Sequence, residues 1–532
     1  MENLTIKNLD HLGIVAGIVD ELEIVETINE IVGEDKREQV SSGTIVKALI
    51  INGLGFVSAP LYLFQEFYRG KASEHLLGKG ITAEKLTDQR IGRVLEKIWE
   101  KGLSQIFIKI AMTGQRKYGV KQETMHLDST SFSVEGEYES EEEEGVIKIS
   151  YGYSKDKRSD LKQYMMNLVC WGDGGVPAMM EMVDGNQSDK ARFGELMKEF
   201  REQWKFEGIY VADAALYSAD NLKKLAQMQW ITRVPLTLKQ AKKLVRATEA
   251  EKFVALEREG YGRYEVEAEY GEMQQRWIVI ESQARKKASQ KKLEKKQQKL
   301  EQQAQKELKK ILTQEFVCEE DARLAVEKLE SQLSHHQIVN LEIREISHYA
   351  QPGKPKANAV PSHITYQPRA ELIFNQELWH QEELAAGRFI LATNILDNSE
   401  LTAEDCLTYY KRPQANEDGF GFLKDPLFFA SSVFLKSPKR IMAVGLIMGL
   451  CLMVYKLGQR QLRQSLAHAH DTIDDQKGKP TQNPTLRWIF QCFMSVHYVQ
   501  VDGESQVVNL TDTRRHILQF LGRKCQHYYL MT

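Results

Sequence analysis

The pattern of apolar and polar positions divides the chain into stretches with different periods. In residues 1–115 the apolar side chains recur at helical spacing. Ser41-Ser42-Gly43 precedes an apolar run over 44–56, and Thr87 or Asp88 precedes a segment with one apolar face, so a helix start is expected at each place. We therefore expect an all-helical N-terminal module. Short helices joined by polar turns are typical of a DNA-binding helix-turn-helix and equally of a dimerisation module.

The period changes at residue 124, where strand character begins. The stretch 124–134 (TMHLDSTSFSV) has this character, with Asp128 near its middle. Residues 146–153 and 163–171 are expected to form two further strands, and 176–182 extends the second hairpin. The pattern predicts antiparallel strands with an aspartate on the first of them.

Helices and strands then alternate. Residues 188–204 have apolar side chains at helical spacing, and 208–212 is a short run of strand formers that ends at Asp213. A second helix is expected over 217–228 and a strand over 230–234. This order predicts an α/β domain, a mixed sheet flanked by helices. In a sheet with this order the first and fourth strands lie side by side, which would bring the two aspartates together.

A block of about 150 residues interrupts this alternation. Strand-like alternation over 250–280 is followed by a helical pattern over 284–312 with eleven Lys or Arg against three Glu. With a second helical stretch at 319–333 it could form a coiled-coil arm or helical hairpin, and the alternative is a solvated charged helix. A buried-type strand at 388–396 then resumes the α/β pattern. The block therefore has the character of an insertion.

Composition excludes several classes of protein. The net charge is −3, so any nucleic-acid affinity must come from local basic patches. Six widely spaced cysteines without a CxxC pair argue against a zinc ribbon or a disulfide framework and fit a reducing cytoplasm. The N-terminus lacks the pattern of a signal peptide. The apolar run over 441–455 has fifteen residues, whereas a membrane span needs about 20, so we expect a buried core helix and no membrane partner.

Three carboxylates at particular positions are the best candidates for chemistry. The chain has no GxxxxGK[ST] loop, no Rossmann fingerprint, no HExxH and no GxSxG, so no nucleotide cofactor is expected. Asp128, Asp213 and Glu417 could instead place three hard oxygen donors around Mg²⁺ or Mn²⁺, and two such ions can drive phosphodiester displacement. Taken singly, these residues could be a turn residue, a helix cap and a surface acid.

Glu417 and Lys424 also have two interpretations. They are seven residues apart, so on a helix they would share one face. The pair could be a solvated ion pair, or a metal ligand beside a phosphate contact.

Several ordered motifs resemble the DDE transposases of bacterial insertion sequences, which have a ribonuclease H-like core. The segment YYKRPQANEDGFGFLKDP at 409–426 resembles the Tyr-(2)-Arg-(3)-Glu-(6)-Lys signature of one large transposase group. The resemblance spans most of the chain, the N-terminal module included. The other matching motifs are HLDSTSFS around Asp128, YGYSKDKRSDLKQ at 151–163, DGNQSD at 184–189, VADAALYS around Asp213 and TN at 393–394.

The resemblance implies roles for particular residues. Asp128, Asp213 and Glu417 would be the metal ligands, whereas Tyr409, Arg412 and Lys424 would contact the phosphates of the transposon end. The chain departs from the family pattern at three places: four residues separate Arg412 from Glu417, Gly421 stands where arginine is expected, and Ala215 where glycine is common. These departures bear on the phosphate contacts more than on the metal ligands.

A second group of cations is a candidate DNA contact. Lys155, Arg158 and Lys162 could hold the DNA backbone opposite the active site, or could belong to a polar hairpin turn. The lysine-rich helix at 284–312 could bind DNA without sequence preference.

The sequence thus predicts a transposase acting on double-stranded DNA. It would bind terminal inverted repeats, cut with Mg²⁺ or Mn²⁺, and join the 3′-hydroxyl to target DNA as a homodimer in the prokaryotic cytoplasm. The alternatives are a ribonuclease H-like nuclease without joining activity, a non-catalytic DNA-binding derivative, and a coiled-coil scaffold. The expected segments are the helical module at 1–115, the catalytic domain at 120–235 and 387–470, the insertion domain at 236–386, and a C-terminal unit at 471–532.

Overall fold

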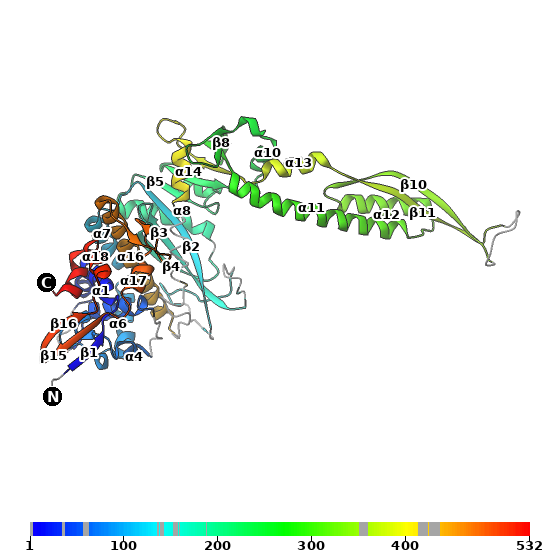
Figure 1. The fold of residues 1–532 in the computed structure, drawn as a ribbon. Coiled ribbons are helices and arrows are strands. Elements are labelled where there is room, and N and C mark those ends of the chain that lie inside the picture. Colours follow the sequence, from blue (N-terminus) through cyan, green and yellow to red (C-terminus); the bar gives the residue numbers. More distant parts are fainter. Residues whose placement is uncertain are drawn as a thin grey trace. The chain divides into compact units, whose positions relative to one another are not determined.

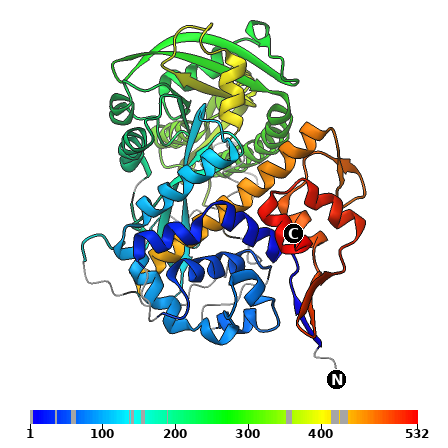
Figure 2. The same cartoon turned by 90° about the vertical axis from the view of Figure 1, so that its left-hand side faces the viewer.

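The chain forms two compact units in the computed structural model (Figures 1 and 2). The first comprises Met1–Thr232, Tyr270–Met273 and Asp405–Thr532, and the second comprises Arg233–Glu269 and Gln274–Glu404. The structure describes residues 4–33, 38–56, 63–135, 138, 143–152, 158, 160–187, 189–350, 360–412, 424 and 437–531.

The N-terminal helices begin where the sequence predicts. The side chain of Ser41 accepts a hydrogen bond from the Thr44 amide at the start of α3, and Thr87 does the same for the Arg90 amide at the start of α6. The apolar face of α6 is buried, as its periodicity requires. The helices are α1 (Leu12–Glu21), α2 (Ile24–Val32), α3 (Ser42–Gly53), α4 (Phe64–Tyr68), α5 (Ser73–Leu77), η2 (Ala83–Lys85), α6 (Asp88–Glu100) and α7 (Leu103–Tyr118).

The expectation of an all-helical N-terminal module is wrong in one respect. Residues Leu4–Asn8 form strand β1, which pairs antiparallel with β15 (His497–Val501), and β16 (Glu504–Val508) completes a three-stranded sheet. Leu4 and Ile6 are exposed, so this strand is defined by backbone pairing with a distant segment rather than by a buried face. Local periodicity carries no signal for such a partner.

The C-terminal helices pack against the first helices of the chain. Figure 2 shows the helices near the two termini side by side, in blue and red. The Tyr529 hydroxyl donates to the Asp10 carbonyl at 2.7 Å, and Lys47 bonds both Asp20 at 2.5 Å and the Tyr528 hydroxyl at 2.8 Å. The C-terminal elements are β13 (Ile473–Asp474), β14 (Pro480–Thr481), α17 (Leu486–Cys492), α18 (Asp512–Gln519) and α19 (Arg523–Leu530).

A mixed sheet in the first unit has the order β4-β3-β2-β5-β6. Its first three members are antiparallel, whereas β5 is parallel to both β2 and β6. The expected contact between the first and fourth strands of the alternating pattern is therefore confirmed, because β2 pairs with β5. The strands are β2 (Thr124–Val134), β3 (Lys162–Trp171), β4 (Pro177–Val183), β5 (Ile209–Ala212) and β6 (Trp230–Val234).

One expected strand, at 146–153, is wrong. Of its described residues, only Ser150 makes a β-bridge, with Gln163 at the start of β3. One edge of β3 pairs with β2 and the other pairs with β4 from Met165 to Cys170, so only the first residues of β3 are left for another segment to pair with.

Helices cover both faces of this sheet. The apolar run at 441–455 forms the middle of α16 (Pro438–Ala469), which begins with a proline in its first turn. This helix is long and apolar enough to cross a membrane, but 94% of its apolar window is buried inside the protein, as expected for a core helix. The other covering helices are α8 (Asp189–Trp204) and α9 (Ala219–Lys224).

The second unit contains a sheet and a long arm. Its strands follow the order β12-β9-β8-β7, and the predicted charged helix is confirmed as α11. In Figure 1 the helices α11 and α12 run beside the ribbon of β10 and β11. The elements are α10 (Lys239–Ala247), η3 (Ala250–Lys252), β7 (Val254–Ala255), β8 (Tyr261–Tyr270), β9 (Met273–Ser282), α11 (Gln283–Leu312), α12 (Glu319–Gln332), β10 (His336–His348), β11 (His363–Phe374), α13 (Gln376–Ala385) and β12 (Arg388–Thr393).

Candidate active site

Asp128 and Asp213 are neighbours on adjacent parallel strands. Leu127 of β2 is in register with Ala212 of β5. Asp128 is therefore the next residue of β2, and Asp213 is the residue that directly follows β5. Paired strands lie about 4.8 Å apart, and residues in register point to the same face. The two carboxylates, 85 positions apart in the sequence, therefore lie close together at the end of β5.

The end of β5 accounts for the exposure of both groups. Asp128 is half-buried although the preceding residues of β2 are buried, and Asp213 is exposed. The Asp213 carboxylate accepts a hydrogen bond from the Ala215 amide at 2.8 Å, and its carbonyl accepts one from the Thr232 hydroxyl at 2.8 Å. The side chain thus fixes the turn that ends the strand.

The sheet face of Asp128 is the one that α16 covers. Asp128 lies opposite Leu168, and Leu168 lies opposite Met180. Directly opposed residues share a face. Met180 also packs close to Gly449 of α16, where an added Cβ would lie 3.1 Å from its sulfur.

His126 lies on the same face, two residues before Asp128. It is buried, and its Nε2 is 3.2 Å from the Thr124 hydroxyl. Burial, with the positive charge of Arg412, lowers the pKa of His126 to about 3, so the ring is neutral at pH 7. The motif HLDSTSFS begins with this histidine, but the sequence alone assigns it no role. Its spacing from Asp128 in a strand is the signal that could have identified it.

Tyr409 and Arg412 lie at the end of α14 (Ala403–Lys411). The Arg412 guanidinium is 4.7 Å from the centroid of the Tyr409 ring and 3.5 Å from the Glu123 carboxylate, just before β2. Burial raises the pKa of Tyr409, which keeps the phenol protonated. The structure thus brings these two predicted phosphate contacts together.

Lys424 lies against the other end of β2. Its Nζ is 5.7 Å from the centroid of the Phe132 ring, and the residue itself is in a turn. Arg412 and Lys424 therefore approach β2 at positions on either side of Asp128.

Two predicted site residues, Glu417 and Lys155, lie outside the described residues. The helical face that Glu417 and Lys424 are expected to share also falls outside them, because residues 413–423 are not described. Within the described part of the chain, no group of three His, Cys, Asp or Glu side chains could hold a metal ion. The described part of the site is thus the aspartate pair.

The other predicted DNA contacts have local partners. Arg158 forms a two-pronged ion pair with Asp160, with nitrogen–oxygen distances of 2.9 Å, on an exposed turn. Lys162, at the start of β3, donates to the Tyr138 carbonyl at 2.9 Å. Their role toward DNA stays a prediction.

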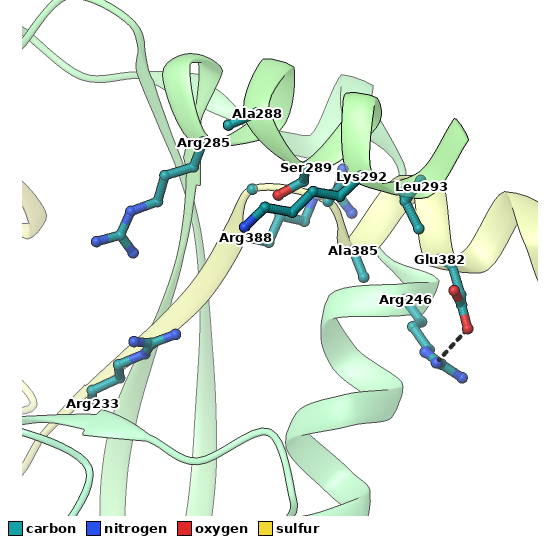
Figure 3. A pocket seen from close by; sticks show the side chains of 12 residues that line it. Arg233, Arg246, Arg285, Ala288, Ser289, Lys292, Leu293, Glu382, Ala385 and Arg388 are labelled. Atoms are coloured by element: carbon teal, nitrogen blue, oxygen red, sulfur yellow. Dashed lines mark ion pairs between the residues drawn. The ribbon is translucent and has the colours of Figure 1, made fainter. Parts of the chain in front are cut away.

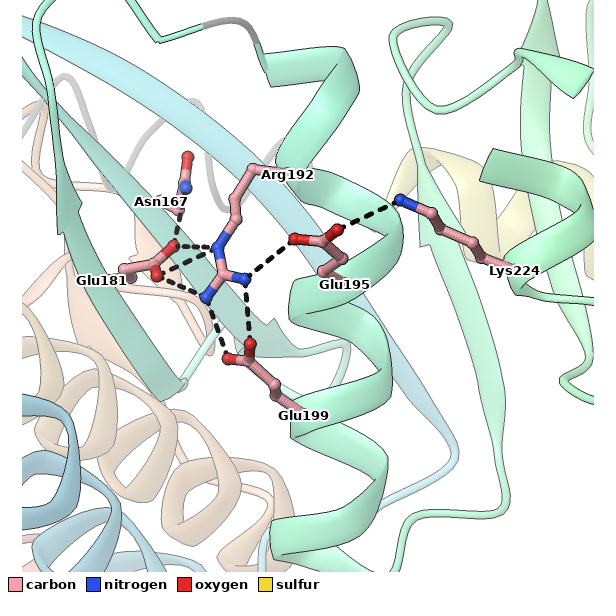
Figure 4. A network of polar contacts seen from close by, with 6 residues as sticks. All are labelled: Asn167, Glu181, Arg192, Glu195, Glu199 and Lys224. Atoms are coloured by element: carbon pink, nitrogen blue, oxygen red, sulfur yellow. Dashed lines mark hydrogen bonds and ion pairs between the residues drawn. The ribbon is translucent and has the colours of Figure 1, made fainter. Parts of the chain in front are cut away.

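A polar network holds α8 on the opposite face of the sheet. Arg192 of α8 bonds Glu181 of β4 at 2.6 Å and Glu199 at 2.9 Å, and Asn167 of β3 bonds Glu181 at 3.2 Å (Figure 4). These carboxylates raise the pKa of Arg192. The network fixes α8 to β3 and β4, on the sheet face opposite to Asp128. The spacing of Arg192 and Glu199 within α8 can be read from the sequence, but the contact of Arg192 with Glu181 cannot.

The fold and the paired carboxylates define an α/β protein with an acidic site where two neighbouring parallel strands of the sheet stop pairing. Residues 121–454 match the family model described as "Transposase DDE domain", which is well over half of the chain. The chain belongs to this transposase family. Residues 4–112 match a second model, described as a domain of unknown function (DUF4277).

One solved structure is similar in fold only at a distance. It is the cryo-EM structure of a piggyBac transposase synaptic complex with hairpin DNA, with a TM-score of 0.37 and 9% identity. The match covers 93% of this chain and 83% of that one. No curated protein matches the sequence.

Proposed function

We propose that the chain is a DNA transposase of the insertion-sequence type. It binds the terminal inverted repeats of its element, cuts the DNA strand there, and joins the freed 3′-hydroxyl to target DNA. The observation that carries the proposal is the pairing of β2 with β5, which places Asp128 and Asp213 directly after the registered pair Leu127 and Ala212, in a chain of the transposase DDE family. The strand order β4-β3-β2-β5-β6, with three antiparallel strands followed by two parallel ones, supports a ribonuclease H-like core.

The donor groups fit a divalent metal ion. Two adjacent carboxylates supply the hard oxygen ligands that Mg²⁺ and Mn²⁺ prefer. Such ions, when bound, would stabilise charge on the attacking and leaving oxygens of the phosphodiester. We propose Glu417 as the third carboxylate. Its flanking residues Arg412 and Lys424 approach β2 on either side of Asp128, which supports this assignment.

The remaining residues would bind and orient the DNA. Arg412 and Tyr409 would hold one phosphate of the transposon end, and Lys424 another. Lys155, Arg158 and Lys162 would contact the backbone farther along. Two ends must be held for joining, so a homodimer is expected in the working complex.

The test is the loss of strand cutting without loss of DNA binding. Asp128→Asn, Asp213→Asn and Glu417→Gln should each reduce Mg²⁺-dependent cutting of an end-containing duplex by about 100-fold or more, because each removes a metal-holding charge. Binding to the same duplex should stay within about threefold of the parent chain.

Two exposed carboxylates far from the pair serve as matched controls. Asp512→Asn, in the first turn of α18, and Glu504→Gln, on β16, should cut at the parental rate. Normal cutting by any one of the three site variants removes that residue from the site. Cut ends that are never joined would identify a nuclease, and binding without cutting by the parent chain would identify a non-catalytic derivative.

A further inference from the structure

A basic cavity lies within the second unit, apart from the residues discussed above. It has a volume of about 530 Å³ and is lined by Arg233, Arg246, Arg285, Lys292 and Arg388 (Figure 3). Glu382 is the one carboxylate among its described lining residues. Arg233 is the first residue of the second unit, at the end of β6, and the other four cations come from α10, α11 and β12, so the second unit brings five cations to one hollow.

Two of these cations are neutralised within the protein. Arg388 is buried, its Nε is 3.0 Å from the Glu281 carboxylate, and its Nη1 donates to the Val245 and Thr248 carbonyls at 3.0 and 2.5 Å. Arg246 is 3.6 Å from the Glu382 carboxylate. That carboxylate also contacts Lys296 at 2.6 Å and His335 at 3.0 Å. Its negative charge is therefore shared among several partners and does little to offset the other cations of the cavity.

The other three cations have no carboxylate within ion-pair distance in the described part of the chain. Arg285 and Arg233 both lie over the ring of Phe389, at 4.9 and 5.8 Å from its centroid. Figure 3 shows their guanidinium groups, with Lys292 above Arg388, around the same hollow. The aromatic contact holds the arginine side chains in place without neutralising them.

A buried donor adds a second observation. The Nη2 of Arg388 has no hydrogen-bond partner among the described residues, although its side chain is fully buried. Leaving such a charged donor without an acceptor is costly. An ordinary solvated cation row would explain Arg285 and Lys292, which are exposed, but not the half-buried Arg233, whose guanidinium shares the Phe389 ring with that of Arg285.

The local backbone is built to bring these groups close. Gly387 has φ +77°, and an added Cβ would lie 2.5 Å from the Lys286 amide nitrogen, so glycine permits β12 to approach the first turn of α11. The Ser282 side chain caps α11, a helix of 30 residues whose positive end faces this region.

We propose that this basic cavity binds a phosphate of the DNA backbone. The planar guanidinium of arginine can donate two parallel hydrogen bonds to the oxygens of one phosphate. Three cations without a carboxylate partner favour an anion that several of them can contact at once. Phe389 is buried and is not among the residues that line the cavity, so it offers no aromatic face for a nucleotide base. The inference rests on the proposed function for the identity of the DNA, and it assigns the second unit a specific role in holding it.

The test compares two triple substitutions that remove the same charge. The cavity variant is Arg233→Gln, Arg285→Gln, Lys292→Gln. The control variant is Lys295→Gln, Lys299→Gln, Lys306→Gln, three exposed lysines of α11 outside the cavity lining. Binding of a fluorescent end-containing duplex to the full chain is measured by anisotropy, without divalent metal, across a range of salt concentrations.

The cavity variant should bind about tenfold more weakly at about 0.1 M salt, and its log–log salt slope should become shallower by about 0.9 for each phosphate that it no longer binds. The control variant should change the slope by less than half as much. Arg233→Lys with Arg285→Lys keeps the charge and should recover part of the affinity, because only the fork geometry is removed. Unchanged melting temperatures show that the variants are folded.

Equal effects of the two triple variants would overturn the proposal, since they would indicate a diffuse charge effect of α11. An unchanged slope in the cavity variant would overturn it as well. If millimolar inorganic phosphate raises the melting temperature of the parent chain but not of the cavity variant, while duplex binding is equal in both, the cavity takes a free anion and the DNA assignment fails. The failure of the proposed function is recognised separately, by normal cutting in Asp128→Asn.

Discussion

Asp128 places a carboxylate in the middle of a strand that is otherwise largely buried. The arrangement is tolerated because β5 pairs with β2 only as far as Leu127. Beyond this point Asp128 is half-buried and retains access to water, so the cost of burying an ionised group is reduced. The same strand end exposes Asp213. A single feature, the short β5, therefore accounts for the position and the exposure of both residues.

Two histidines in the first unit are buried as neutral rings. The Nε2 of His11 is 2.8 Å from the Leu54 carbonyl, so Nε2 carries the proton, and the ring stacks on Phe490 with centroids 4.4 Å apart. Burial lowers the pKa of His11 to about 4. The pKa of His126 is lowered further, to about 3.

The stability of the first unit should therefore fall with acidification. A folded-state pKa below the unfolded value of about 6.5 means that the unfolded chain binds the proton more readily below about pH 6.5. The stabilisation by neutral His11 is complete above that pH and is lost as the pH falls toward the folded-state pKa of about 4. Between pH 7 and pH 5 the loss from His11 should be about 2 kcal/mol.

Urea denaturation at pH 7 and pH 5 checks this loss. His11→Gln keeps a donor for the Leu54 carbonyl but cannot titrate, so the difference between the two pH values should shrink by about 2 kcal/mol. An undiminished difference in His11→Gln would show that other groups cause the acid sensitivity.

At the scale of elements, glycines set how closely helices pack. In α1 an added Cβ at Gly17 would lie 2.5 Å from the backbone of Cys525 in α19, and one at Gly13 would meet the Tyr529 ring at 2.8 Å. The α1–α19 contact therefore depends on the absence of side chains along one face of α1. It joins the two ends of the sequence within one unit.

Gly17→Ala should destabilise the protein by about 2 kcal/mol, because the clash is with backbone that cannot move independently. Gly194→Ala in α8 is the matched control. Its Cβ would lie 3.0 Å from the flexible Lys224 side chain, so helix propensity should leave stability unchanged or raise it by up to about 1 kcal/mol. Thermal denaturation of the two variants measures the difference, and equal melting temperatures would refute the close α1–α19 contact.

At the scale of the molecule, the first unit is assembled from segments at both ends of the chain. Residues of the N-terminal helices bond to the C-terminal helices through Lys47, Asp20 and Tyr528, and β1 pairs with β15. The N-terminal helices consequently lack part of their core without the last 47 residues from Leu486.

Truncation before Leu486 should therefore abolish folding of the first unit, because it exposes the buried face of α1 and leaves the buried Lys47 with only one of its partners. Near-UV circular dichroism and size-exclusion chromatography should show loss of tertiary packing or aggregation. Removal of residues 531–532 alone is the control and should have no effect. A truncated chain with a native near-UV spectrum would contradict the interpretation.

Much of the local structure follows from the sequence. The helix starts at Ser41 and Thr87, the strand around Asp128, the strand that ends at Asp213 and the buried core helix at 441–455 are all encoded in periodicity and capping residues. These features depend on contacts within a few residues, so a local pattern is sufficient to predict them.

Other features are decided only by contacts between distant segments. The pairing of β1 with β15, the failure of 146–153 to extend the sheet and the convergence of arginines on the basic cavity depend on which strand edges and helix faces meet. By itself, the sequence determined that two aspartates stand in or beside strands. The order of the elements also predicted that these two strands are neighbours. The tertiary structure decided their register, which places the aspartates next to each other, because the alignment of β2 and β5 is a property of the assembled sheet.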